Sequence, residues 1–227
     1  MGEAVRVWRI PLLVSDEVVA RYVNCLSEDE RTRADRFRFE ADRRKFVVAR
    51  GTLRHLLGER FGCAAGAIAF CYGQYGKPET SASPDGASHF HFNLSHSGEM
   101  ALCALGGDRN VGVDIERVKP IQRLDSMMDR CLVEEEKSQV TAQPGDKQSR
   151  AFLQYWTCKE AYLKAIGLGL AQSMTTVEVD LSAPKLLTAP KPCAEEWQLY
   201  KLDLTESYVG ALVVAGKSAI EIDCWQH

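Results

Sequence analysis

Two helical blocks, each accompanied by short strands, constrain the fold of this chain more than any other feature of its sequence. The helical blocks are predicted at residues 15–62 and 121–166, the second with a linker-like stretch at 141–148. Short apolar runs or apolar–polar alternation, typical of β-strands, occur at residues 5–11, 68–72, 90–95, 100–105, 111–116, 177–181, 197–199, 209–215 and 220–222.

Because helices followed by strands occur twice, the sequence predicts a pseudo-duplicated α+β fold. Its two similar halves are residues 1–107 and 108–227, each with helices packed on an antiparallel sheet. The short turns between residues 90 and 116 predict that the three strands there form an antiparallel meander.

Capping signals mark the starts of the first helices. Ser15 or Asp16 can cap a helix that runs to about residue 26. Ser27 with Glu30 three residues later forms a capping-box signature, which predicts that a second helix begins there.

The composition is that of an ordinary soluble globular protein. The 227 residues are 45% hydrophobic and 26% charged, and no apolar run approaches the roughly 20 residues that span a bilayer. The N-terminus has no basic segment followed by an apolar one, so we expect no secretory signal, no membrane partner and a cytoplasmic location. The formal net charge of −3 gives no electrostatic reason to expect nucleic-acid binding.

The cysteine pattern argues against disulfides and zinc. A chain of this length without an export signal does not need disulfide staples, and no two cysteines form a Cys-x-x-Cys pair. Most have apolar neighbours, so we expect reduced core residues at Cys25, Cys63, Cys71, Cys103, Cys131, Cys158, Cys193 and Cys224.

Two carboxylates alternate with apolar residues in the strand at 111–116. Residues two apart in a strand share a face, so Asp114 and Glu116 should point the same way while Val113 and Ile115 face the core. Adjacent carboxylates repel each other unless a cation lies between them, and Mg²⁺ prefers such oxygen ligands. The alternative is a solvated strand face.

The helix predicted near residue 160 has two faces with different residue types. Trp156, Glu160 and Lys164 are spaced by four and share one face. Taken alone, Glu160 and Lys164 could be an ordinary surface pair, worth only about 0.3–0.5 kcal/mol. Another stripe is expected to face the core, and consists of Tyr155, Cys158, Tyr162 and Ile166.

A polar turn follows the strand at 90–95. In residues 92–98 the strand leads through Ser95 and His96 into a glycine turn. One interpretation is a phosphate cradle of backbone N–H groups and the imidazole. The other is a turn with a solvent-exposed histidine.

Four segments in this order resemble the signature segments of the surfactin-type 4′-phosphopantetheinyl transferases. They are residues 75–78 (YGKP), 92–97 (FNLSHS), 112–116 (GVDIE) and 156–164 (WTCKEAYLK). The resemblance extends over most of the chain, from about residue 7 to about residue 215, and residues 26–57 resemble cyanobacterial members.

The resemblance implies a monomer of two α+β halves with coenzyme A bound in the cleft between them. Such enzymes move the phosphopantetheine arm from coenzyme A to a serine of an acyl or peptidyl carrier protein and release 3′,5′-adenosine bisphosphate. Their carriers serve fatty-acid, polyketide and nonribosomal peptide biosynthesis.

Two alternatives belong to other functional classes. The first is a non-catalytic coenzyme A or carrier-protein binding module of the same fold, which is expected to have lost a carboxylate or Lys164; here all are present. The second is a Mg²⁺-dependent nucleotide hydrolase, but the sequence contains no P-loop.

The resemblance also implies roles for individual residues. Asp114, Glu116 and Glu160 are expected to hold Mg²⁺, for which Mn²⁺ can substitute, against the diphosphate. Glu160 is the expected base for the serine hydroxyl, directly or through a water, and Lys164 is expected to stabilise or protonate the leaving phosphate.

Contacts to coenzyme A are implied at a wider set of positions. Ser95 and His96 are expected to bind phosphate, the turn at 76–78 to lie against the adenine, and Lys159 to contribute charge. The full expected set is Arg33, Gly76, Lys77, Pro78, Ser95, His96, Asp114, Lys159 and Lys164.

Two positions depart from the family pattern. A pair of family lysines aligns with Glu30 and Arg33, so only Arg33 keeps the charge, and Phe46 replaces a threonine near the 3′-phosphate. Replacement contacts are expected among the nearby arginines Arg31, Arg33, Arg43, Arg44 and Arg50, with Arg54 as another matched basic position. The alternative is that these arginines belong to solvated helix faces.

Carrier proteins of this class present an acidic helix, and we expect them to dock near residues 127–132. The alternative is that the methionines of this segment fill the core of the second half. The expected anchors and flanking charges are Arg123, Met127, Met128, Arg130, Cys131 and Leu132.

Overall fold

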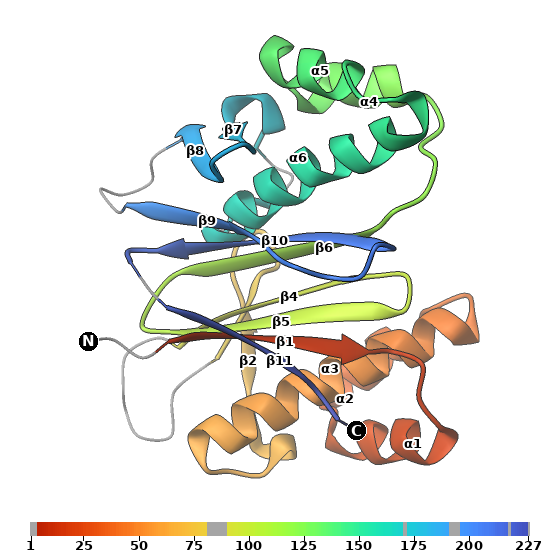
Figure 1. Cartoon of the computed structure of the whole chain (residues 1–227). Helices are drawn as coiled ribbons and strands as arrows, with labels where there is room; N and C mark the ends of the chain where they lie inside the picture. The colour runs from red at the N-terminus through yellow and green to blue at the C-terminus, as the bar shows by residue number, and fades with distance from the viewer. Residues whose placement is uncertain (1–3, 81–89, 170–171, 191–195, 218, 227) are drawn as a thin grey trace.

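The chain folds into layers, with two β-sheets in the centre and helices on the outer face of each (Figure 1). The computed structural model describes residues 4–80, 90–169, 172–190, 196–217 and 219–226. In chain order the elements are β1 (Val5–Pro11), α1 (Asp16–Cys25), α2 (Glu28–Asp35), α3 (Glu40–Phe61), η1 (Ala65–Ala67), β2 (Phe70–Tyr72), β3 (Pro78–Thr80), β4 (His91–Ser97), β5 (Met100–Gly107), β6 (Val111–Arg117), α4 (Leu124–Cys131), α5 (Glu134–Thr141), α6 (Gly145–Ala165), η3 (Met174–Thr176), β7 (Glu178–Asp180), β8 (Lys185–Thr188), β9 (Trp197–Lys201), β10 (Tyr208–Ala215) and β11 (Ile220–Cys224).

The first sheet has the strand order β11-β1-β5-β4 and carries α1, α2 and α3 on its outer face. β1 is antiparallel to β5, and β5 is antiparallel to β4. A core that includes Ile10, Tyr22, Leu53 and Phe92 fills the space between this sheet and its helices. This half confirms the predicted packing of helices on an antiparallel sheet.

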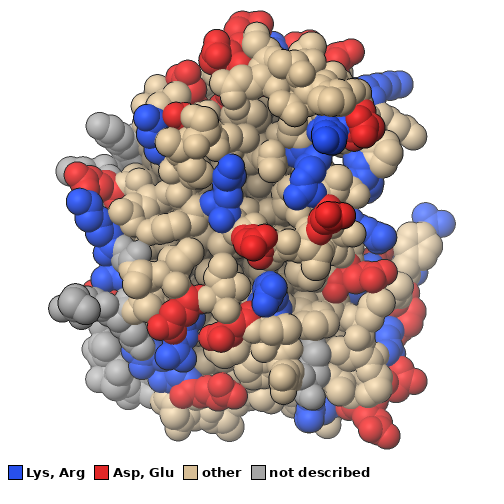
Figure 2. All heavy atoms as spheres, in the orientation of Figure 1, with Lys and Arg blue, Asp and Glu red and all other residues tan. Residues whose placement is uncertain are grey.

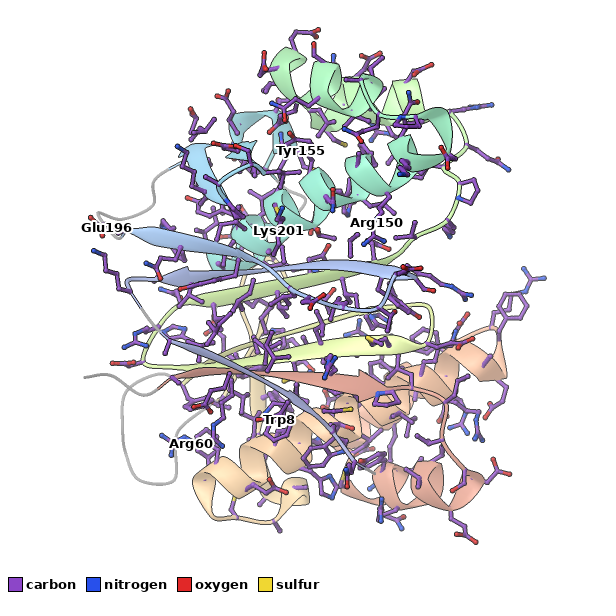
Figure 3. The ribbon with its side chains drawn as sticks, viewed as in Figure 1. Trp8, Arg60, Arg150, Tyr155, Glu196 and Lys201 are labelled. Carbon is purple, nitrogen blue, oxygen red and sulfur yellow. The ribbon has the colours of Figure 1, made fainter. Side chains whose placement is uncertain are left out.

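The second sheet has the order β6-β10-β9 and is covered by α6, with α4 and α5 beyond it. Tyr155 points from α6 toward α5, where its hydroxyl donates to Gln139 at 2.6 Å (Figure 3). A separate core with Val113 and Leu212 lies between the two sheets. The predicted α+β fold with two halves is therefore confirmed.

The predicted meander is wrong in its third strand. β4 and β5 pair as expected, but β6 pairs antiparallel with β10 of the second sheet. β4 and β6 instead lie side by side, joined by side-chain hydrogen bonds. The apolar pattern of β6 gives it a face to bury in either sheet, so the pattern does not determine its partner.

The last strand crosses back to the first sheet, although residues 108–227 were predicted to form the second half together. β11 pairs in parallel with β1. Trp225 follows it and donates its Nε1–H to the hydroxyl of Tyr22 at 3.0 Å. The predicted boundary at 107/108 lies in the turn between β5 and β6. Of the described strands that follow this boundary, β11 is the one that belongs to the first sheet.

Several helix ends follow the predicted signals. The Ser15 side chain accepts from Val18 N–H at 3.5 Å, and Glu30 Oε2 accepts from Ser27 N–H at 3.0 Å. The second helical block differs from the prediction, because α6 begins at Gly145 inside the stretch expected to be a linker. None of the described helices combines the length and apolarity needed to cross a bilayer.

The cysteines are free thiols within the described residues, but not all lie in the core. Cys103, Cys131 and Cys158 are buried as expected, whereas Cys71 and Cys224 are exposed. Both cysteines lie in edge strands, where side chains can be exposed. The types of the neighbouring residues did not reveal that these strands lie at an edge. Cys193, and residues 81–88 of the predicted polar loop, lie outside the described residues.

Gly112 of β6 allows α6 to lie directly against the second sheet. A Cβ at this position would lie 2.0 Å from the carbonyl oxygen of Ala161 and 2.4 Å from the amide nitrogen of Ala165. Both neighbours are helix backbone, so neither can rotate away. The distance between β6 and α6 therefore depends on the absence of a side chain at residue 112.

We expect Gly112→Ala to lower the free energy of unfolding by about 1–3 kcal/mol, because an overpacked backbone contact must move apart. Gly145→Ala is the matched control, since nothing lies within 4 Å of a Cβ there. Urea denaturation of both variants measures the difference. An unfolding free energy for Gly112→Ala equal to that of the wild type would show that this contact does not set the distance.

Candidate functional site

The two strand carboxylates lie on the face of β6 that the alternation predicted. Val113 and Ile115 are buried between the sheets, while Asp114 and Glu116 point to the other side. Asp114 is only 4% exposed and Glu116 is half-buried. The solvated strand face is therefore the wrong alternative for Asp114.

Helix α6 brings Glu160 and Lys164 to the same place. Lys164 Nζ lies 2.5 Å from Asp114 Oδ1 and 3.0 Å from Ser95 Oγ. Glu160 is only 6% exposed. The lysine thus pairs with the strand carboxylate across the structure, and the alternative of an ordinary surface pair within the helix is wrong.

The site holds more negative charge than its own lysine offsets. Burial, and then the charges of Asp114 and Glu116, raise the pKa of Glu160 to about 7, against the opposing effect of Lys164. Burial also raises the pKa of Glu116, against the hydrogen bond from Ser97. Asp114 Oδ2 and Glu160 Oε1 are buried without a hydrogen-bond partner.

This donor set fits a divalent cation by its chemistry. Three carboxylates, two of them with an unpartnered buried oxygen, supply the hard oxygen ligands that Mg²⁺ takes. Within the described ranges, no three acidic, histidine or cysteine side chains already form a group that could hold an ion. The charge and the orphaned oxygens, rather than a preformed cage, are the observations that favour a metal here.

Strand β4 contributes three polar side chains at alternate positions, and each contacts β6. Asn93 Oδ1 accepts from Val113 N–H at 2.9 Å. Ser95 Oγ donates to Asp114 Oδ1 at 2.7 Å, and Ser97 Oγ donates to Glu116 Oε2 at 2.7 Å. Ser95 was expected to bind phosphate; the structure places its hydroxyl between Asp114 and Lys164.

A cavity of about 330 Å³ opens beside these groups. Its lining joins the turn before β3, strand β4, helix α6 and the segment that follows α6. The lining residues are Tyr75, Gly76, Lys77, Pro78, Asn93, Glu160, Lys164, Gly167 and Gly169. The structure thus brings the predicted turn at 76–78 to the predicted catalytic residues.

The Lys77 side chain anchors this turn to the end of α6. Its Nζ donates to the carbonyl oxygens of Lys164 at 2.9 Å, Ala165 at 3.2 Å and Val111 at 3.4 Å. Burial lowers the pKa of Lys77 to about 8. Its ammonium completes the helix C-terminus, where carbonyls lack internal partners.

His96 lies on the exposed side of β4 among positive charges. Desolvation of the ring, followed by the charges of Lys164, Lys45 and Arg33, lowers its pKa. The Arg33 guanidinium lies over the ring of Phe46 at 5.3 Å. Phe46 therefore supports Arg33 by a cation–π contact, although its side chain cannot donate a hydrogen bond.

Arg50 and Arg54 belong to the protein's interior. Glu30 Oε1 accepts from Arg50 and Oε2 from Arg54, each at 2.6 Å, and all three side chains are buried. The charge of Glu30 therefore binds both arginines. Arg43 and Arg44 pair with Glu40 and Asp16, and Arg31 donates to carbonyls of residues 23 and 24.

Lys159 was expected to contact coenzyme A, but its side chain lies outside the residues that line the cavity beside Lys164. The Lys159 side chain is 0% exposed, with Nζ 2.5 Å from Glu136 Oε2. It also donates to the carbonyl oxygens of Cys131 and Met174. Helical spacing turns residue 159 about 100° away from residue 160, which directs it into the helical layer.

The expected docking anchors are mostly core residues. Met128 is 7% exposed, Cys131 7% and Leu132 2%, and all three pack into the core of the second half. They cannot present apolar anchors to a partner, so the alternative assignment holds for them. Arg123 and Arg130 are exposed and Met127 is half-buried.

For three residues at the site, the sequence did not predict the structural role. Asn93 lay inside a quoted motif but had no assigned role, and the contacts of Ser97 and Gly112 were not foreseen. The signal that could have revealed the first two is the polar alternation of residues 93, 95 and 97, which is unusual for a strand whose neighbours are buried.

Comparison with known proteins places both halves. The profile of the "4′-phosphopantetheinyl transferase superfamily" matches residues 110–213, and that of "4′-phosphopantetheinyl transferase, N-terminal" matches residues 14–106. The chain is 37% identical over 219 residues to the 4′-phosphopantetheinyl transferase HetI of Nostoc sp., covering 95% of this chain and 90% of that one. It is 29% identical over 168 residues to the 4′-phosphopantetheinyl transferase Sfp of Bacillus subtilis, covering 74% and 72%.

One solved structure shows a partial likeness. A holo-(acyl-carrier-protein) synthase from Bacillus anthracis, in complex with CoA (3′,5′-ADP), superposes with a TM-score of 0.40 at 27% identity. The match covers 47% of this chain and 94% of that chain.

Proposed function

The chain belongs to the 4′-phosphopantetheinyl transferase family, and we propose that it transfers the arm of coenzyme A to a serine of apo acyl and peptidyl carrier proteins. The reaction is Mg²⁺-dependent and releases 3′,5′-adenosine bisphosphate. The observation that carries the proposal is the ion pair of Lys164 with Asp114 beside Glu160, at the cavity lined by residues 76–78.

Asp114, Glu116 and Glu160 are the residues that would hold Mg²⁺, or Mn²⁺ in its place. The bound ion supplies neutralisation of charge on the diphosphate. The orphaned oxygens of Asp114 and Glu160 are the support in the structure for this assignment. β6, α6 and the segment that follows α6 belong to the half at 108–227, and the turn at 75–78 and β4 belong to the half at 1–107.

Glu160 is the proposed base. Its side chain lines the cavity beside Lys164, where it can accept the proton directly or through a water. The proton leaves the carrier serine as its oxygen forms a bond to the β-phosphorus of coenzyme A. The bond from that phosphorus to the bridging oxygen breaks, and the negative charge goes to the departing bisphosphate.

Lys164 is the proposed partner of the leaving phosphate. Its ammonium is held at the cavity by Asp114 and Ser95, so it is oriented before substrate arrives. The turn at 76–78 is proposed to contact adenine through its backbone, because the Lys77 ammonium already serves α6. Since one chain supplies every side of this cleft, we propose a monomer.

The transfer itself is tested by mass spectrometry of an apo carrier protein incubated with coenzyme A and Mg²⁺. We expect the wild type to add one phosphopantetheine, and Glu160→Gln and Asp114→Asn to lower kcat/KM by about 10²–10⁴-fold, as for loss of a base or charge stabiliser. Glu28→Gln on exposed α2 is the control. Binding of coenzyme A without transfer would instead make the chain a non-catalytic module.

The 3′-phosphate is proposed to bind His96 and Arg33. Burial and the neighbouring positive charges lower the pKa of His96 and so favour its neutral form in the free protein, whereas a bound phosphate dianion favours its protonated form. Binding of coenzyme A should therefore take up a proton, and its affinity should rise as pH falls from 8 toward 6.5.

Calorimetry in two buffers of different ionisation enthalpy measures this proton uptake. We expect His96→Gln to abolish the uptake and to weaken coenzyme A by roughly 10–100-fold, the size of a charge-assisted contact. The 3′-dephospho form should be insensitive to the substitution. An equal loss for both ligands would remove His96 from the 3′-phosphate.

For the carrier protein, the exposed face of α4 with Arg123 and Arg130 remains the proposed contact for an acidic helix. We expect the double variant Arg123→Glu/Arg130→Glu to raise the KM for carrier several-fold, since rim charges govern encounter. The KM for coenzyme A and the melting temperature should not change. Lys217→Glu, also exposed, is the charge-matched control, and an unchanged carrier KM would place docking elsewhere.

A further inference from the structure

Asn93 is held in one orientation by the edge of the second sheet. Its side chain is 6% exposed, and Oδ1 accepts from the backbone N–H of Val113 at 2.9 Å. A backbone N–H can only donate, so the atom that faces it must be the amide oxygen. The amide NH₂ group of Asn93 therefore faces the other way.

The side chain of Asn93 borders the cavity of about 330 Å³ at the candidate site. Asn93 lines that cavity together with Glu160 and Lys164. Among the contacts of the described residues, the Asn93 NH₂ donates to no protein acceptor. A fixed donor that borders a cavity without a protein partner is ready to bind an oxygen of a ligand.

The neighbours of Asn93 indicate which kind of oxygen this is. The Lys164 ammonium beside it attracts an anionic group, whereas Glu160 and Asp114 tolerate one only when a cation offsets them. Ser95 and Ser97, the equivalent side chains of β4, are both used by carboxylates. Asn93 is therefore the member of this row that remains for the substrate.

We propose that Asn93 is a substrate-binding residue, whose amide NH₂ donates to a phosphate oxygen of the coenzyme A diphosphate while its Oδ1 holds β6 in place. This inference rests on the proposed function. The side chain then has two separable roles: Oδ1 accepts a hydrogen bond that stabilises the fold, and the NH₂ group donates one to the ligand.

Two substitutions separate these tasks. Asn93→Asp keeps an oxygen for Val113 N–H but replaces the donor by an acceptor, whereas Asn93→Ala removes both. We expect both variants to weaken coenzyme A by about 10-fold or more in calorimetry with Mg²⁺ and without carrier protein. Thermal melting should show a larger loss for Asn93→Ala than for Asn93→Asp. Asn24→Asp on the exposed face of α1 controls for the added charge.

The outcomes are distinct. Coenzyme A affinities within about two-fold of the wild type in both variants would overturn the inference. A fall in kcat with unchanged coenzyme A affinity would also overturn it, because Asn93 would then act by orienting Glu160. Mn²⁺ affinity measured by electron paramagnetic resonance should stay unchanged in Asn93→Ala. If the wild type neither binds coenzyme A nor modifies a carrier, the proposed function itself fails.

Discussion

The approach of α6 to Gly112 is the constraint from which the geometry of the site follows. Ala161 and Ala165 are the helix residues that meet the glycine, and they directly follow Glu160 and Lys164 in sequence. A rotation of about 100° per residue therefore turns Glu160 and Lys164 from that contact toward the neighbouring position of β6. A larger residue at 112 would move the helix away and take both functional side chains with it.

The second constraint is the line along which β4 and β6 meet. Each is the edge of its own sheet, and an edge carries unpaired backbone groups that must find partners. Asn93 satisfies one N–H of β6, and Ser97 accepts from Arg117 N–H at 3.0 Å. The same row of side chains orients Asp114 and Glu116. The two halves of the fold are thus joined by the same side chains that position the carboxylates.

The sequence predicted the arrangement of side chains correctly wherever that arrangement depended on a single helix or strand. Alternation within β6 predicted that Asp114 and Glu116 share a face, and spacing of four on α6 predicted that Glu160 and Lys164 do. It failed where two elements had to be chosen as partners: β6 leaves the meander, and β11 returns to β1. The sequence also did not show which way a charged side chain points. A buried lysine at residue 159 and an exposed one have the same local sequence pattern, and only the position of the partner Glu136 distinguishes them.

Two buried charge clusters outside the site show why the site is different. Both oxygens of Glu30 are taken by arginines, and both oxygens of Glu136 are bound, by Lys159 and by the N–H groups of residues 133 and 179. Removing such charges from water is costly unless each atom is paired, and here each is. At Asp114 and Glu160 one oxygen apiece is buried without any partner. Glu30 and Glu136 have partners on both oxygens, whereas Asp114 and Glu160 each lack one. The cost of burying these two carboxylates therefore falls where a cationic ligand can offset it.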